Sequence, residues 1–114
     1  MTLSFFHFSS IKEFIIQDDH VFYGAPVVIF ITARINDEWG GLNTGMCAQN
    51  MMLAAQSLGL ATCPVGFAKM VTEIKDYYLL NIPETETVEL AIIVGYADED
   101  PKPHPRAKDN VTYL

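Results

Sequence analysis

The chain has 114 residues and a formal net charge of −7, and 50% of its residues are hydrophobic, with a mean hydropathy of +0.19. A chain of this length is expected to form a single domain, residues 1–114, that buries about two-thirds of its unfolded surface. The acidic excess argues against nucleic acids and anionic membranes as partners, because phosphate binding needs a basic face. The large apolar share favours contact with a second subunit over a merely well-filled core.

The N-terminal segment predicts a short helix that runs from Ser9 or Ser10 to Ile16. Ser10 and Glu13 have the spacing of a capping box, in which each residue satisfies a backbone N–H of the first helical turn. The first residues, "MTLSFFHFSSIKEF", lack the basic start and long apolar run of a signal peptide. We therefore expect a cytoplasmic protein.

The stretch "APVVIFITA", Ala25–Ala33, predicts the first buried strand. Its residues are β-branched or apolar without alternation, which is typical of a strand that is covered on both faces. Pro26 fits only at the start of this strand, because a proline further in would remove a donor from the ladder.

A helix is predicted within "NTGMCAQNMMLAAQSLGL", residues 43–60, inside a span from Trp39 to Ala68 that has no charged residue. Asn43 or Thr44 can cap its start, and Gly59 suits the left-handed position after its end. Polar residues interrupt it too often for a membrane span. Its apolar stripe comprises Cys47, Met51, Ala54, Ala55 and Leu58, and further apolar residues lie off the stripe at Met46, Met52 and Leu53. A helix that is apolar nearly all round is central to a fold or shared between subunits.

The uncharged stretch "ATCPVGF", Ala61–Phe67, follows this helix and predicts a turn. Proline fixes its own φ angle, and glycine lets a backbone approach a ligand closely. Two interpretations stay open at this point. The segment is either a plain turn between helix and strand, or it directs a backbone N–H at an electron-rich atom of a bound ring.

The remaining elements are a helix, a strand and an arm. "AKMVTEIKDYYLL", residues 68–80, predicts a helix with Val71, Ile74 and Tyr78 on one face, and Pro83 follows its end. "TVELAIIVGY", residues 87–96, predicts a second buried strand. The proline-rich end predicts an extended arm, whose last residues, "VTYL", could add as an edge strand to a partner subunit. The expected fold class is α+β (mixed α/β), with helices packed on a small sheet.

Side chains suited to catalysis are sparse. There is no nucleophile elbow, no dinucleotide fingerprint and no spacing typical of a metal site, and we expect Cys47 and Cys63 to be buried and inert. Any chemistry should therefore be carried by a cofactor. The stretch "KPHPRAK", which includes Lys102, Arg106 and Lys108, is either a solvated tail or a site for a small anion such as a phosphate.

Three stretches in this order resemble the flavin-dependent nitroreductase family. They are "GAPVVIFITA", "GMCAQNMMLAAQSLGLATCPVGF" and "LLNIPETETVELAIIVGYADEDPKPHPRAK", and the resemblance covers about residues 20–114. It implies FMN bound at the interface of a homodimer, with NAD(P)H as electron donor and a nitroaromatic, quinone or similar small molecule as acceptor. It also implies that the backbone of Pro64, Val65 and Gly66 faces the flavin ring, with one N–H directed at N5. Arg106, supported by Lys108, would pair with the FMN phosphate. No protein side chain is expected to act as catalyst, and no metal is expected.

One departure from the family leaves other functions open. The family's Arg-rich N-terminal motif has no counterpart here, since the first arginine is Arg34 and the only earlier cation is Lys12. The chain thus resembles the C-terminal portion of the family, and weak FMN binding is expected. The alternatives are a truncated member without flavin or activity that acts as a dimerising protein, and a small-ligand-binding module.

Overall fold

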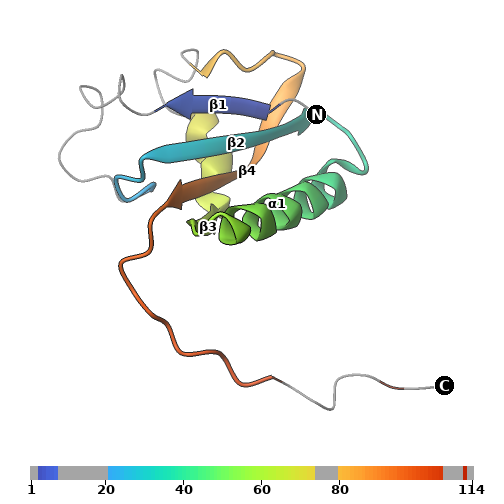
Figure 1. Cartoon of the computed structure of the whole chain (residues 1–114). Coiled ribbons are helices and arrows are strands. Elements are labelled where there is room, and N and C mark those ends of the chain that lie inside the picture. Colours follow the sequence, from blue (N-terminus) through green and yellow to red (C-terminus); the bar gives the residue numbers. More distant parts are fainter. Residues whose placement is uncertain (1–2, 8–20, 74–79, 107–111, 113–114) are drawn as a thin grey trace.

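The computed structural model describes residues 3–7, 21–73, 80–106 and 112. An antiparallel sheet runs through the middle of the fold, in the strand order β1-β2-β4-β3 (Figure 1). The elements in chain order are β1 (Leu3–His7), β2 (Val27–Arg34), α1 (Gly40–Ser57), β3 (Ala61–Val65), the 3-10 helix η2 (Gly66–Glu73) and β4 (Glu86–Gly95). The predicted short helix at residues 9–16 lies outside the described residues.

Helices cover the two faces of the sheet, so the expected α+β architecture is confirmed. On one face, Ile31 and Ile92 pack against Ala48 of α1. On the other face, Val28, Phe30, Val88 and Ala91 form a cluster with Ala68 and Val71 of η2. Figure 1 shows α1 in front of the strands and the yellow η2 segment behind them. The central strands β2 and β4 are therefore covered from both sides, as their largely apolar sequences predict.

The two predicted strands are present with small shifts at their ends. The first is β2, which begins at Val27, directly after Pro26, and the second is β4. Strand β1 was not predicted. It pairs along its whole length with β2, from Leu3 opposite Ile31 to His7 opposite Val27. A five-residue strand has too short a pattern to identify by itself, and its partner is distant in the sequence.

The predicted N-cap of α1 is wrong, because the helix begins a turn earlier than Asn43 or Thr44. Its N-cap is Trp39, which makes no capping bond through its side chain. Asp37 organises the preceding turn instead: its carboxylate accepts the Trp39 N–H at 3.0 Å, and its carbonyl accepts the Gly40 N–H at 3.1 Å. The local hydrogen bonds of an aspartate therefore decide where this helix starts.

The buried stripe of α1 is also rotated from the predicted one. Ala54 and Leu58 are exposed, Leu58 by 75%, whereas the sheet-facing residues are small ones, namely Gly40, Thr44, Ala48 and Ala55. Small side chains let the helix backbone approach the sheet closely, and the long Met51 and Met52 fill the space beside them. The close approach of α1 to the sheet, more than the hydrophobicity of its side chains, therefore determines which face of the helix is buried.

Gly59 ends α1 as predicted. Its φ of +74° lies in the left-handed region, which costs a non-glycine residue free energy. The Gly59 N–H donates to the Gln56 carbonyl at 3.1 Å, and the Leu60 N–H donates to the Ala55 carbonyl at 3.0 Å. This pair of bonds is a Schellman motif, and it turns the chain directly into β3.

A β-bulge interrupts the pairing of β2 with β4 at Glu89. Ile31 lies opposite Leu90 and Thr32 lies opposite Val88, so Glu89 has no partner residue on β2. The extra residue shifts the alternation of side chains along β4. As a result, Val88 and Ala91, three residues apart, both contribute to the cluster on the η2 side.

Beyond β4 the chain leaves the sheet as an extended arm. Residues 96–106 have no regular secondary structure, and the arm runs away from the sheet and helices (Figure 1). The predicted C-terminal edge strand lies almost wholly outside the described residues. Within the described ranges, no helix combines the length and the hydropathy that crossing a bilayer requires.

Candidate functional site

The stretch predicted as a turn, Ala61–Val65, is instead the edge strand β3. It pairs with β4 from Ala61 opposite Gly95 to Val65 opposite Ala91, and Gly66 begins η2 immediately afterwards. Long-range pairing with β4 therefore overrode the local turn signal. Pro64 is accommodated because β3 lies at the edge of the sheet, where a missing donor can face away from the ladder.

The position of Pro64 decides which backbone N–H can reach a ligand. Since Pro64 has no N–H, its pair with Ile92 cannot exchange two hydrogen bonds, and the flanking Val65–Ala91 pair is a hydrogen-bonded one. The Val65 N–H is then directed into the sheet. The Gly66 N–H lies beyond this last pair, at the start of a helix, where the first N–H groups have no partner within the helix. Of the three predicted residues, only Gly66 can donate to a ligand.

The surroundings of Gly66 are open. The residue is exposed, and a Cβ added to it would meet no other atom within 4 Å. Pro64 is also exposed, whereas the Val65 side chain is 8% exposed and belongs to the core cluster on the η2 side. A flat molecule could thus approach this edge of the sheet beside Pro64 and Gly66. The buried Val65 side chain holds the backbone between them in place.

The helix η2 that follows Gly66 presents three different rows of side chains. In a 3-10 helix, residues three apart lie above one another. One row, Ala68 and Val71, is buried in the core, and a second row, Phe67 and Met70, is exposed by 75% and 60%. The third row contains Gly66 and Lys69, and the Lys69 ammonium forms an ion pair with Glu89 of β4. The β3–η2 junction is therefore attached to the body by both apolar and ionic contacts.

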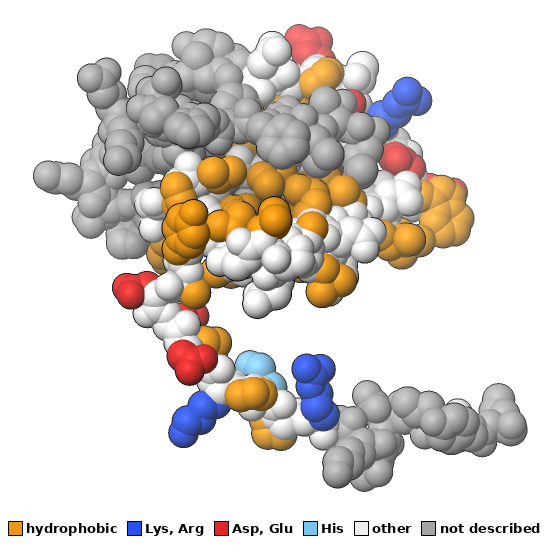
Figure 2. All heavy atoms as spheres, in the orientation of Figure 1, with side chains coloured by type: hydrophobic (Ala, Val, Ile, Leu, Met, Phe, Trp, Pro, Cys, Tyr) orange, Lys and Arg blue, Asp and Glu red, His pale blue; other side chains and the backbone are white. Residues whose placement is uncertain are grey.

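The predicted phosphate-binding residues lie elsewhere. Arg106 is exposed on the arm, and Lys108 is outside the described residues. Figure 2 shows the arm's acidic residues near the body and its cations further out. Arg106 follows Gly95 by eleven residues, a length that can span at most about 36–40 Å. Within one chain, the structure does not bring Arg106 beside Pro64 and Gly66.

Comparison with known proteins identifies the family. A model of the nitroreductase family matches residues 13–96. The chain belongs to the nitroreductase family. Over 81 residues it is 38% identical to the 4-nitrobenzoate reductase of Pseudomonas putida, a match that covers 69% of this chain and 35% of that protein. It is 33% identical over 72 residues to the NADPH-flavin oxidoreductase of Vibrio harveyi, covering 63% of this chain and 30% of that protein.

Solved structures of the nitroreductase family share the fold. A nitroreductase with bound FMN from Bacteroides fragilis superimposes with a TM-score of 0.79 at 20% identity, covering 99% of this chain and 75% of that chain. A nitroreductase with bound FMN from Desulfitobacterium hafniense also has a TM-score of 0.79, at 20% identity, covering 98% and 74%. In contrast, the chain spans only about a third of the length of the curated relatives it matches.

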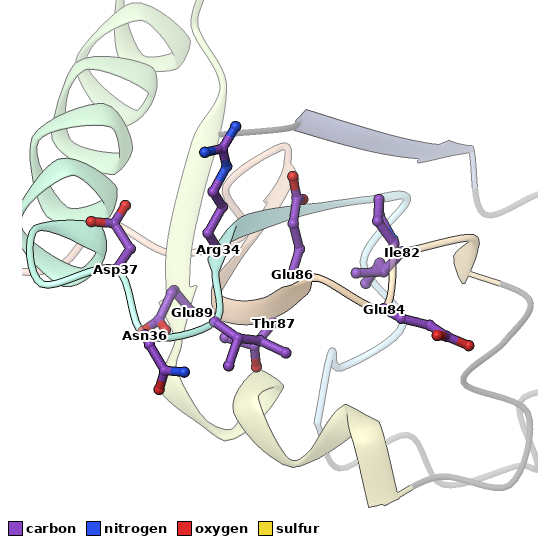
Figure 3. Close-up of a pocket in the computed structure, with 10 residues that line it drawn as sticks. Arg34, Asn36, Asp37, Ile82, Glu84, Glu86, Thr87 and Glu89 are labelled. Carbon is purple, nitrogen blue, oxygen red and sulfur yellow. The ribbon is translucent and has the colours of Figure 1, made fainter.

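A pocket of about 510 Å³ in this nitroreductase-family chain involves none of the predicted site residues (Figure 3). It lies where β2 ends and β4 begins, and its charged lining residues are Arg34, Asp37, Glu84, Glu86 and Glu89. Glu86 accepts a hydrogen bond of 2.6 Å from the fully buried Thr32 hydroxyl. Carboxylates outnumber the single cation, so the lining disfavours an anionic group such as a phosphate.

The cysteines differ from the prediction of buried thiols. Cys63 is exposed on β3, and Cys47 is half-buried on α1 with its thiol 3.7 Å from the Met51 sulfur. Alternation does not explain the exposure of Cys63, because Cys63 shares one strand face with the buried Val65. In the part of the chain that the structure describes, no group of three or more His, Cys, Asp and Glu side chains could hold a metal ion.

Proposed function

We propose that this chain acts as an FMN-dependent NAD(P)H oxidoreductase of the nitroreductase type, passing electrons to a nitroaromatic, quinone or similar small acceptor. The observation that carries the proposal is the Gly66 N–H, which lies past the last pair of an edge strand beside open space. Family membership supports it, as do relatives named as 4-nitrobenzoate reductase and NADPH-flavin oxidoreductase. We keep the cytoplasm, where NAD(P)H is available, as the predicted location.

In this proposal the backbone at Pro64 and Gly66 lies against the flavin ring, and the Gly66 N–H donates to its N5 atom. The space beside Gly66 supports this placement, since an added Cβ would meet no atom of the described residues within 4 Å. FMN supplies the hydride chemistry when bound, so the protein contributes binding and orientation rather than an acid or base.

The phosphate would be held by Arg106 with support from Lys108. A phosphate carries nearly two negative charges and needs charge-assisted hydrogen bonds, which a guanidinium provides well. Because the arm leads away from its own β3 edge, Arg106 is better placed to complete a site in a second copy of the chain. The proposed site is therefore shared between two subunits of a homodimer.

The outer face of α1 supports the proposed homodimer. Helix α1 contains no charged residue, and Leu42, Met46 and Leu53 on its solvent side are each more than half exposed. These three residues lie on one face, because their spacings of four and seven match helical turns. An uncharged apolar face of this kind is unusual on a monomer and typical of a subunit interface.

A second candidate function is a family member that binds no flavin. The exposure of Arg106 on an arm that runs away from the sheet favours it. Each missing charge-assisted phosphate contact would weaken FMN binding by about tenfold to a hundredfold. We accordingly expect FMN to bind weakly to the isolated chain.

A titration with FMN distinguishes the two candidates. Flavin fluorescence should be quenched on binding, and the loaded protein should oxidise NADPH or NADH when an acceptor is added. Two variants then test the donor: Gly66→Ala keeps the N–H, whereas Gly66→Pro removes it. We expect Gly66→Pro to bind FMN about threefold to tenfold more weakly than Gly66→Ala, the effect of one hydrogen bond. No quenching at any FMN concentration would instead support the flavin-free candidate.

A further inference from the structure

An ion pair joins η2 to the central strand β4 just beside the proposed flavin contact. The Lys69 Nζ lies 2.5 Å from the Glu89 Oε2. The Glu89 side chain is 20% exposed and that of Lys69 is 59% exposed. The acidic partner is thus held largely within the fold, while the basic partner reaches it from the surface of η2.

The β-bulge explains why Glu89 can reach η2. In a regular strand, Val88 and Glu89 would point to opposite faces, and Glu89 would lie on the α1 side. Here Glu89 is the extra residue of the bulge, and Leu90 after it belongs to the cluster on the α1 side. Glu89 is thereby free to turn toward η2 and meet Lys69. Bulges commonly re-aim a side chain in this way.

Lys69 and Gly66 share one row of η2. They are three residues apart, so in a 3-10 helix they lie above one another. A restraint on Lys69 is therefore transmitted through a single helical turn to the Gly66 peptide. The neighbouring row, Ala68 and Val71, is fixed by the core, which keeps the helix from rotating as a whole.

The segment around Gly66 is attached to β4 at two points. Val65, directly before Gly66, pairs with Ala91, and Lys69, three residues after it, pairs with Glu89. The two β4 residues are themselves only two positions apart. These attachments close a small loop of backbone, and the Gly66 N–H lies within it.

We infer that Lys69 and Glu89 are positioning residues that set the direction of the Gly66 N–H. Neither side chain is placed on the ligand itself; the ion pair acts through the η2 turn. The consequence for FMN rests on the proposed function, whereas the effect on the Gly66 peptide does not. A partly exposed ion pair contributes little to global stability, so its effect should be local.

The test uses the whole chain without FMN, observed by NMR. Lys69→Met and Glu89→Gln each remove the ion pair, and Glu84→Gln is the matched control, because Glu84 is exposed and makes no ion pair in the described structure. In the two test variants, the Gly66 amide resonance should shift, and hydrogen exchange of the Val65 amide should accelerate by about fivefold, the upper effect of such a pair. The control should leave both unchanged.

The charge-swapped double variant, Lys69→Glu with Glu89→Lys, should restore the Gly66 resonance and the Val65 exchange rate toward wild type. If a single variant fails to fold, high salt applied to the wild-type chain provides the same test, because salt weakens a partly exposed ion pair. Where FMN binds, its affinity should fall by about threefold to fivefold in the single variants and recover in the double variant.

The outcomes separate the inference from the proposed function. Unchanged Gly66 and Val65 amides in both single variants, or no recovery in the swapped variant, would overturn the positioning role. A wild-type chain that binds no FMN would overturn the proposed function, while the amide measurements would still decide whether the ion pair orients Gly66.

Discussion

The β3–η2 junction and the C-terminal arm carry the two halves of the predicted site, and they differ in how they are held. The junction is fixed by strand pairing at Val65, by burial of Ala68 and Val71, and by the Lys69–Glu89 ion pair. The described part of the arm, residues 96–106, is exposed throughout and runs away from the sheet.

This difference shows which part of the site a single chain can build. The backbone proposed to bind the ring needs only the sheet and η2, and both are formed within one copy. In the proposed function, the cations predicted to bind the phosphate need a surface to lie on, and we propose that a second copy of the chain provides it. We propose the charge-free outer face of α1 as the surface by which two such copies join.

The largest expected effect comes from breaking the proposed dimer. Leu53→Glu places a charge on the apolar face of α1, where Leu53 is 59% exposed in the single chain. Burying an unpaired charge in an interface costs about 3 kcal/mol or more, so the dimer dissociation constant should rise at least about a hundredfold. Sedimentation velocity over a range of protein concentrations measures this change.

Ile35→Glu is the control for that variant. Ile35 is 52% exposed in the loop after β2, away from the α1 face, and should leave the dimer intact. If both variants, or neither, alter the sedimentation behaviour, α1 does not form the interface. If Leu53→Glu is monomeric and yet binds FMN with wild-type affinity, the site is not shared between copies.

The next largest effect is expected on the arm. Arg106→Ala should weaken FMN binding by about tenfold to a hundredfold, because a charge-assisted hydrogen bond to the phosphate is lost. Its unfolding midpoint should match that of the wild type, since Arg106 is exposed. Lys102→Ala removes a cation from the same arm and should change affinity far less. If both variants lose FMN affinity equally, Arg106 acts only through general charge attraction and not through a specific bond to the phosphate.

The smallest effect concerns the turn that leads into the junction. Gly59→Ala forces a side chain into the left-handed region and should lower the free energy of unfolding by about 1–2 kcal/mol. Gly45→Ala is the matched opposite: Gly45 lies within α1, and an added Cβ meets no atom within 4 Å. It should raise stability by about 0.5–1 kcal/mol. Urea denaturation measures both, and changes of the same sign would contradict the assigned α1 end.

Much of the body could be predicted because its signals are local. The largely apolar sequences of β2 and β4 indicated burial on both faces, and Gly59 marked the end of α1. The start of α1 was missed because Asp37, which lay outside the expected helix, organises the preceding turn. The buried face was misjudged because close packing selected Thr44 and Ala48 over larger apolar residues.

The site was predictable only in part. The sequence singled out the segment Pro64 to Gly66, which stays a predicted site, but it could not show that this segment pairs with β4 as an edge strand up to Val65. The Lys69–Glu89 ion pair had no sequence signal, since it joins residues twenty apart through a bulge whose position depends on the register of β2. The placement of Arg106 likewise required the course of the arm in space.

The sequence by itself determined the family, the buried strands, the central helix with its glycine stop, and the stretch that carries the candidate backbone donor. These features depend on composition and on contacts between near neighbours along the chain. Only the tertiary structure decided that "ATCPV" is an edge strand, that Gly66 follows its last pair, and that Arg106 is exposed on an arm that runs away from the sheet. The physical reason is that strand pairing, the position of a bulge and the course of the arm all depend on contacts between segments that are distant in the sequence. No local pattern encodes which of these segments will meet.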